Sequence, residues 1–157
     1  ILDNVCIPLV LKGEDKTESH EKALGYFELF GLDGFETKYP HQLSGGMRQR
    51  AAMLRTYLFS DDIILLDEPF GGLDAITKRN MQAWLLEVLE ALNASVFFIT
   101  HDIEEAILLS DRIYVLSERP ARVSMEIPVD MERPRSPEIV TSAKFNEIRK
   151  QILELLR

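Results

Sequence analysis

Basic residues are in the minority in this 157-residue chain, which holds 18 Lys and Arg against 26 Asp and Glu and has a formal net charge of −8. A nucleic-acid-binding protein normally presents a basic face, and a protein held on anionic lipid by charge alone also needs positive charge. We therefore expect no nucleic-acid partner. The charge does not argue against contacts with a membrane protein, because such contacts are local.

Cysteine and long apolar runs are also scarce. Cys6 is the single cysteine, so a disulfide framework and a Cys/His metal spacing are both excluded, and we expect it to be a small buried apolar residue. The apolar runs are short and flanked by charges, which predicts no signal peptide and no membrane span. The chain opens with Ile1 rather than methionine, as we expect of a fragment.

The apolar pattern predicts an α/β domain. Apolar residues at helical spacing predict helices at about 17–30, 45–58, 76–92, 102–109 and 140–156. Continuous apolar runs predict strands at 63–66, 95–100 and 112–116, the first of them buried on both faces, and 122–129 could pair with the third as a hairpin. Alternating strands and helices are typical of a parallel sheet flanked by helices.

Two carboxylates and a proline, Asp67-Glu68-Pro69, directly follow the strand predicted at 63–66. Ligands of open α/β sheets bind at the carboxyl ends of the strands. There Asp67 can hold Mg²⁺, directly or through water, and Glu68 can act as a general base toward an attacking water. The same residues could also do no more than end a strand, and this motif alone leaves both interpretations open.

Leu43-Ser44-Gly45-Gly46 precedes the helix predicted at 45–58. Ser44 and the two glycines expose backbone N–H groups at a helix N-terminus, where the helix dipole favours an anion such as a phosphate. A plain N-cap with a flexible approach would have the same sequence.

His101 lies within Thr100-His101-Asp102, directly after the predicted strand 95–100. A histidine in this place can donate a hydrogen bond to a phosphate oxygen. A lone histidine is more often structural or solvated, so the residue type alone does not assign a role.

The three motifs occur in one order: a glycine-rich helix start, a strand ending in Asp-Glu and a strand ending in His. In this order the sequence resembles the ABC ATPase family. Leu43–Gly46 are similar to its signature motif, Ile63–Glu68 to its Walker B motif, Gly72–Asp74 to its D-loop and His101 to its switch histidine. The resemblance implies a P-loop NTPase (ABC ATPase) fold, a parallel sheet flanked by helices, here incomplete and with a helical subdomain.

Further segments resemble the ATPases of nitrate, sulfonate and taurine importers: Pro40-His41-Gln42, Asp67–Gly71, His101–Ala106, Leu116–Pro120 and Ile127–Asp130. This resemblance implies an ATP-binding and ATP-hydrolysing subunit that energises uptake of a small solute from the cytoplasmic face of the membrane. Its partners would be membrane permease subunits, a second ATPase subunit and, indirectly, a solute-binding protein.

The same resemblance implies that ATP and Mg²⁺ lie between two paired subunits, with the signature residues reaching the γ-phosphate across the interface. Seven residues receive roles: the catalytic Glu68 and His101, the nucleotide-binding Ser44, Gly45, Gly46 and Asp74, and the magnesium ligand Asp67.

One motif of the family is missing from this sequence. No Gly-x-x-x-x-Gly-Lys-Ser/Thr run, the Walker A loop, occurs in the 157 residues, and this loop supplies much of the phosphate grip in such ATPases. We therefore expect the chain by itself to bind ATP poorly and to hydrolyse none. We also expect the incomplete sheet to expose strand edges and apolar faces.

Three parts are expected: a helical subdomain with the signature motif at 1–58, a catalytic α/β core at 59–120, and a C-terminal hairpin and helix at 121–157. Two alternatives stay open. A DNA-repair or chromosome-organising ATPase would interrupt the domain with a long coiled coil, whereas here one helix separates the signature and Walker B motifs. A non-catalytic interaction module is favoured by the missing Walker A loop and disfavoured by Glu68 and His101.

Overall fold

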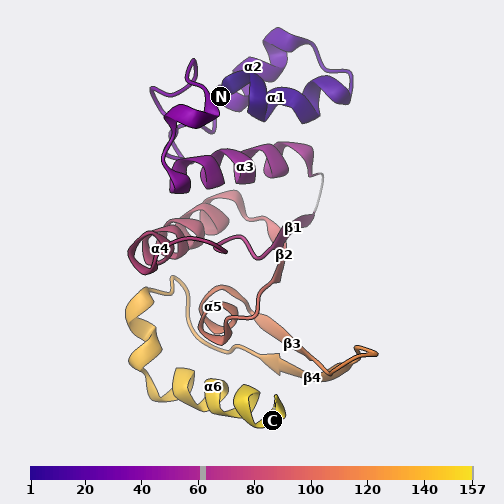
Figure 1. Cartoon of the computed structure of the whole chain (residues 1–157), viewed down its shortest axis with the longest axis vertical. Helices are drawn as coiled ribbons and strands as arrows, with labels where there is room; N and C mark the ends of the chain where they lie inside the picture. Colours follow the sequence, from indigo (N-terminus) through magenta and orange to yellow (C-terminus); the bar gives the residue numbers. More distant parts are fainter. Residues whose placement is uncertain (61–62, 157) are drawn as a thin grey trace.

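The computed structural model describes residues 1–60 and 63–156. Figure 1 shows the elements following one another along the longest axis, from the N-terminal helices at one end to the C-terminal helix at the other. The helices are α1 (Leu2–Leu11), α2 (Lys16–Leu24), α3 (Gly45–Phe59), α4 (Ala75–Leu92), α5 (Ile103–Leu109) and α6 (Ala143–Leu155), with 3₁₀ turns η1 (Pro40–Gln42) and η2 (Pro137–Thr141). The strands are β1 (Ile63–Asp67), β2 (Ser95–Ile99), β3 (Arg112–Leu116) and β4 (Val123–Pro128).

The predicted helix from Thr17 to Phe30 is wrong in its length. Helix α2 ends at Leu24 with Gly25 at its C-cap, and its N-cap is Asp15, whose carboxylate accepts a hydrogen bond from the N–H of Thr17 at 2.7 Å. Phe27 and Phe30 are buried as expected, but they lie in the turns that follow the helix. Glycine is a poor helix residue, and the turns after it let both aromatic rings reach the core.

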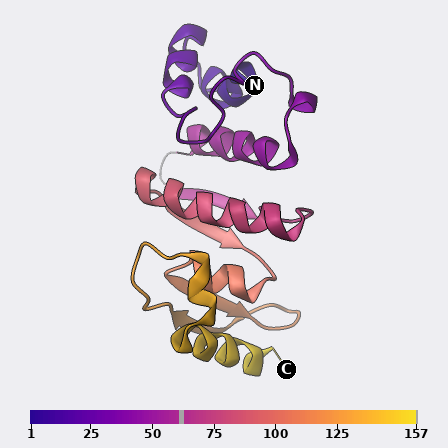
Figure 2. The ribbon, with the colours of Figure 1, turned by 90° about the vertical axis from the view of Figure 1, so that its left-hand side faces the viewer.

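Strands β1 and β2 pair in parallel, in a register that places Asp67 opposite Ile99. Side chains of a strand alternate between its two faces, and here only one face is covered: Ile64 and Leu66 are buried, whereas Leu65 is 68% exposed. The expectation that this strand is buried on both faces is therefore wrong for the described chain. Figure 2 shows why, since α4 lies across one side of the β1–β2 sheet.

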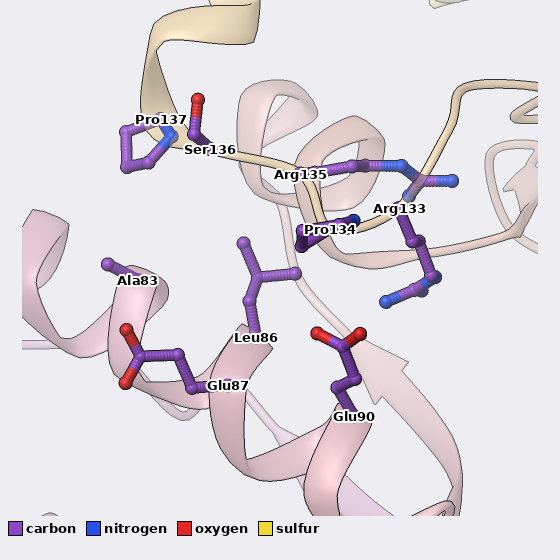
Figure 3. Close-up of a pocket in the computed structure, with 9 residues that line it drawn as sticks. All are labelled: Ala83, Leu86, Glu87, Glu90, Arg133, Pro134, Arg135, Ser136 and Pro137. Atoms are coloured by element: carbon purple, nitrogen blue, oxygen red, sulfur yellow. The ribbon is translucent and has the colours of Figure 1, made fainter.

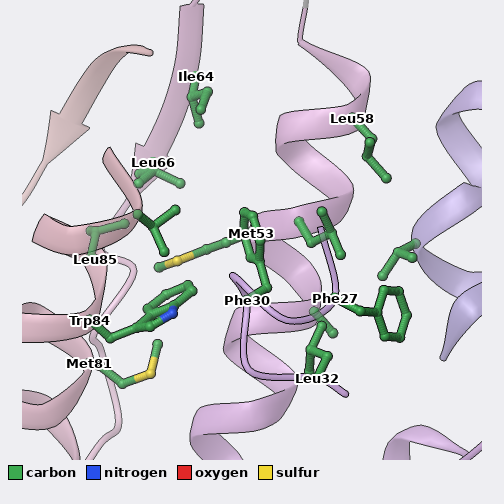
Figure 4. Close-up of a cluster of buried hydrophobic side chains, with 14 of the residues drawn as sticks. Phe27, Phe30, Leu32, Met53, Leu58, Ile64, Leu66, Met81, Trp84 and Leu85 are labelled. Carbon is green, nitrogen blue, oxygen red and sulfur yellow. The ribbon is translucent and has the colours of Figure 1, made fainter. Parts of the chain in front are cut away.

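Side chains of α1, α2, the turns after α2, α3, β1, α4 and the end of α5 (Leu108 and Leu109) form one hydrophobic cluster, called here the large cluster. Figure 4 shows Met53 of α3 and Trp84 of α4 meeting in its middle. The Trp84 ring packs edge-on against Phe30 with centroids 5.6 Å apart, and its Nε1–H donates to the carbonyl of Leu29 at 3.2 Å. The fully buried members include Val5, Cys6, Leu9, Phe27, Phe30, Leu32 and Leu54.

A separate set of buried side chains, the small cluster, joins α5, the antiparallel β3–β4 hairpin and α6. It consists of Ile107, Ile113, Val115, Ile127, Val129, Phe145, Ile148 and Ile152. The hairpin predicted at 112–116 and 122–129 is confirmed.

Arg135 connects the linker after β4 to the C-terminal end of α5. Its guanidinium donates to the carbonyls of Leu108 at 3.3 Å, Ser110 at 2.6 Å and Val129 at 3.0 Å. These contacts satisfy carbonyl groups that a helix end leaves without an intrahelical partner. Close by, the linker packs on α4 around a cavity of about 170 Å³, where Pro134 lies near Leu86 (Figure 3).

Candidate functional site

Two carboxylates, those of Asp67 and Glu68, lie at the C-terminal end of β1. Glu68 continues the pairing with β2 for one more bond, because its N–H donates to the carbonyl of Ile99 at 2.9 Å. Its backbone then turns into the left-handed region with φ 46°, a conformation that non-glycine residues seldom adopt. The carbonyl of Glu68 accepts from the N–H of Gly71 at 3.0 Å, which closes the turn.

His101 lies at the end of the neighbouring strand and contacts Glu68 twice. Its Nδ1 is 2.6 Å from Oε1 of Glu68, and its backbone N–H donates to the same oxygen at 3.1 Å. The hydrogen bond to Glu68 raises the pKa of the His101 imidazole, and the negative charge of that carboxylate adds to the effect. The structure therefore brings together the two residues predicted to be catalytic, with Asp67 next to Glu68 in the chain.

The remaining predicted site residues line a different place, a cavity of about 440 Å³ between the start of α3 and the start of α4. Ser44, Gly45 and Gly46 line one part of this cavity, and Asp74 lines another. Asp67, Glu68 and His101 are absent from the described lining. The seven residues thus fall into two groups, one at the strand ends and one at the helix starts.

Both helix starts carry an N-cap. The hydroxyl of Ser44 accepts from the N–H of Met47 at 3.3 Å. The carboxylate of Asp74 accepts from the N–H groups of Ile76 at 3.1 Å and Thr77 at 3.0 Å. The hydroxyl of Thr77 also donates to Asp74 at 2.6 Å, and this hydrogen bond is the main cause that lowers the pKa of Asp74. Asp74 is therefore a structural cap that also faces the cavity.

The donor set suits a magnesium ion that keeps most of its own water. Among residues 1–60 and 63–156, no three His, Cys, Asp or Glu side chains gather closely enough to hold a metal. Mg²⁺ commonly binds through one or two carboxylates, with waters and phosphates completing its shell. The exposed Asp67 beside Glu68 fits that mode and does not fit a cage made of protein ligands alone.

Sequence reasoning missed the residues that support His101. Lys78 of α4 contacts both Asp102 and the buried Glu105, and Thr100 donates to Glu105. The sequence places Asp102 and Glu105 three residues apart at a helix start, where a cap is typical. It gives no indication that a lysine 24 positions earlier reaches both.

A profile described as ABC transporter matches residues 2–71. Over all 157 residues the chain is 46% identical to an uncharacterized ABC transporter ATP-binding protein of Methanocaldococcus jannaschii, of which it covers 58%. The chain belongs to the family of ABC transporter ATP-binding proteins.

Other ABC proteins agree in sequence and in fold. The aliphatic sulfonates import ATP-binding protein SsuB of Bacillus cereus is 43% identical over 97% of this chain and 58% of that protein. The solved dimeric structure of a bacterial ABC transporter cassette matches with a TM-score of 0.63 and 31% identity, covering 83% of this chain and 57% of the other. The predicted P-loop NTPase fold is confirmed, and the chain spans about 58% of the length of these ABC relatives.

No helix among the described residues of this ABC protein is both long and apolar enough to cross a membrane.

Proposed function

We propose that the chain is part of the ATP-binding and ATP-hydrolysing subunit of an ABC importer that energises uptake of a small solute such as nitrate, a sulfonate or taurine. The observation that carries the proposal is the pair of Glu68 and His101 at the ends of two parallel strands, 2.6 Å apart. Similarity to a relative also supports the proposal: the aliphatic sulfonates import ATP-binding protein SsuB matches nearly the whole chain.

The proposed chemistry is attack of a water molecule on the γ-phosphate of ATP. Glu68 would accept the proton of that water, and His101 would donate a hydrogen bond to a phosphate oxygen. Mg²⁺, held on the side of Asp67, would neutralise charge that develops on the phosphates. Because Glu68 Oε1 already accepts two hydrogen bonds from His101, both side chains would have to rearrange when nucleotide enters.

The second group of residues would act on a nucleotide held by a partner. Ser44, Gly45 and Gly46 expose a helix N-terminus to the 440 Å³ cavity, and such an end favours a phosphate. Two subunits paired head to tail would bring this surface to the other subunit's strand ends, and Asp74 beside it would help couple the two sites. The separation of the two groups in one chain supports such a pairing.

The proposed partners are membrane permease subunits, a second ATPase subunit and, indirectly, a solute-binding protein, at the cytoplasmic face of the membrane. Residues 1–58 would form the helical subdomain that faces the permease, 59–120 the catalytic core and 121–157 a C-terminal hairpin and helix. The Walker A loop would come from a segment outside the 157 residues, so the chain by itself would be inactive.

Calorimetric titration of MgATP tests the proposal on two proteins, this chain and the same chain extended upstream. We expect binding and hydrolysis only by the extended form. Glu68→Gln in the extended form should bind MgATP and lose hydrolysis by a factor of about 10² to 10⁴, the usual contribution of a general base. Lys144→Met, which removes an exposed ion pair with Asp130 far from both groups of site residues in the sequence, is the control.

Three outcomes would contradict this account. Binding by neither form would favour a non-catalytic interaction module. Tight binding by the short chain would show that the phosphate grip does not need the missing loop. Full hydrolysis by the Glu68→Gln variant would remove the role of general base from Glu68.

A further inference from the structure

Lys78 lies one turn into α4 and contacts two carboxylates of α5 and its N-cap. Its Nζ is 2.7 Å from Oδ2 of Asp102 and 2.6 Å from Oε1 of Glu105. Burial acts to lower the pKa of Lys78, but the hydrogen bonds to Asp102 and Glu105 outweigh it and the pKa is raised. The ammonium group therefore stays charged between two carboxylates.

Glu105 also contacts the loop before α5, and so connects that loop to Lys78. Its side chain is only 4% exposed, and its second oxygen, Oε2, accepts from the hydroxyl of Thr100 at 2.6 Å. The same hydroxyl oxygen accepts from the N–H of Asp102 at 3.0 Å. A buried carboxylate with a partner on each oxygen holds its neighbours in one arrangement.

The residues on either side of His101 are thus tied to Lys78 and Glu105, while His101 itself is not. Its side chain is 86% exposed and contacts Glu68. Lys78 in turn belongs to the helix that Asp74 caps, and the N–H of Lys78 donates to the carbonyl of Asp74 at 2.8 Å. A rigid connection therefore runs from Asp74 through the first turn of α4 to the loop that carries His101.

We propose that the Lys78–Glu105 ion pair is a positioning device that fixes the loop Thr100–Asp102, and with it His101, against the helix that begins at Asp74. Its consequence for ATP hydrolysis rests on the proposed function. Lys78 acts through the backbone of its neighbours and is not a catalytic residue. The pair links the two groups of site residues, the strand ends and the helix starts, within one chain.

A loss of stability alone would not establish this role, because removing Lys78 leaves Glu105 buried without its cation, which is destabilising for any such pair. The informative comparison is between Lys78→Met, which keeps the length of the side chain, and Lys78→Arg, which keeps its charge. Lys144→Met is the matched control, since Lys144 pairs with Asp130 at 3.0 Å on an exposed surface.

Residue-resolved amide hydrogen exchange, measured by NMR on this chain, reports directly how well the amides of the loop Thr100–Asp102 are protected. The N–H groups of His101 and Asp102 donate to Glu68 and Thr100, so their exchange reports whether the loop keeps its place. We expect Lys78→Met to speed the exchange of both by about tenfold, as for a lost hydrogen bond. Lys78→Arg should restore slow exchange, and Lys144→Met should leave it unchanged.

Unchanged exchange in the Lys78→Met variant would overturn the proposal. If that variant does not fold, Thr100→Val decides, because it removes the link from the loop to Glu105 and leaves Lys78 and Glu105 paired. We expect the same acceleration for the amide of His101 in a folded Thr100→Val protein, because its acceptor, the carboxylate of Glu68, is left in place by the substitution. Exchange as slow as in the unchanged chain would then overturn the proposal.

Steady-state kinetics of the upstream-extended form test the consequence for hydrolysis. A misplaced His101 should lower kcat by about tenfold and change KM for MgATP by less than roughly twofold, with recovery in Lys78→Arg. Unchanged kcat in Lys78→Met, beside an active unsubstituted protein, would overturn this role. An inactive unsubstituted protein would instead contradict the proposed function, and the exchange measurement would still decide the positioning device.

Discussion

The outer faces of the two sheets differ. On β1–β2 the outer face is apolar, and Leu65 is 68% and Phe97 53% exposed. On β3–β4 the outer face also carries exposed charge, because Arg112 and Glu126 form an ion pair across the strands at 2.9 Å. Parallel sheets are normally covered on both faces, whereas antiparallel sheets commonly leave one face in water. We therefore expect another protein surface to cover the open face of β1–β2, whereas the face of β3–β4 that carries the ion pair can remain in water.

The largest effect is expected from Phe145→Ala in the small cluster. Phe145 is fully buried between α6 and the β3–β4 hairpin, and such a truncation costs about 3–5 kcal/mol. Urea unfolding followed by circular dichroism should detect the loss of α6 and the hairpin. The fluorescence of Trp84, the single tryptophan, should report the unfolding of the large cluster. We expect the substitution to shift the urea midpoint of this signal less than that of the circular dichroism signal.

The exposed Leu156→Ala serves as the control and should change little. If both signals of Phe145→Ala shifted together by the same amount, the two clusters would unfold as one unit, and the contrast drawn between them would fail.

Arg135→Met should destabilise the small cluster by about 2–3 kcal/mol. The substitution leaves the carbonyls at the end of α5 without their donor, and hydrogen bonds from a charged group are worth about 1.5–3 kcal/mol. Arg135→Lys should recover only part of the loss, because an ammonium cannot reach the same carbonyls as a planar fork. Thermal melts should show that Arg135→Met loses more stability than Arg135→Lys. Equal losses of stability in the two variants would contradict the role of the planar guanidinium group.

Leu65→Thr and Leu66→Thr form a matched pair on the two faces of β1. Leu66→Thr should cost about 2 kcal/mol or more, because it places a hydroxyl in the large cluster. Leu65→Thr should change the free energy of unfolding by less than about 0.5 kcal/mol and reduce self-association of the chain through its open face. Sedimentation velocity and urea unfolding measure both quantities. A chain that sediments as a monomer before any substitution would contradict the expected association.

The smallest effect is expected at the exposed edge of β1–β2, from Glu68→Gln. Loss of the carboxylate should lower the pKa of His101 toward its ordinary value of about 6.5. Since folding raises this pKa, the pair contributes stability that is fully present below about pH 6.5 and is lost as the pH rises through the raised value. NMR titration of the imidazole signals measures the shift, with His20 and His41 as internal references. An unchanged His101 titration would show that the contact with Glu68 does not form in solution.

Local patterns predicted most of the elements. The helix expected at 45–58 is observed as Gly45–Phe59, and the one at 76–92 as Ala75–Leu92, because apolar spacing and the caps Ser44 and Asp74 agree. The strand at 112–116 has the expected bounds. The motifs placed Glu68 and His101 each after a predicted strand, and the structure shows that these strands are parallel neighbours whose ends bring the two side chains into contact.

Features that depend on distant contacts were not predictable in the same way. The end of α2 at Leu24 depends on how Phe27 and Phe30 fit the large cluster. The apolar run of β1 indicated burial on both faces, but the sequence could not show that the described chain covers only one of them. Arg135 and Lys78 each bridge residues more than 20 positions away, and nothing in their immediate neighbours marks them.

The left-handed backbone of Glu68 affects which substitutions this protein tolerates over evolutionary time. With φ at 46°, a residue with a Cβ costs of order 1–3 kcal/mol that a glycine at the same place would not. Selection for stability alone would therefore drift this position toward glycine, and a stabilised variant library should enrich Glu68→Gly. Retaining a carboxylate there requires an advantage that offsets this cost, and the contact with His101 supplies part of it.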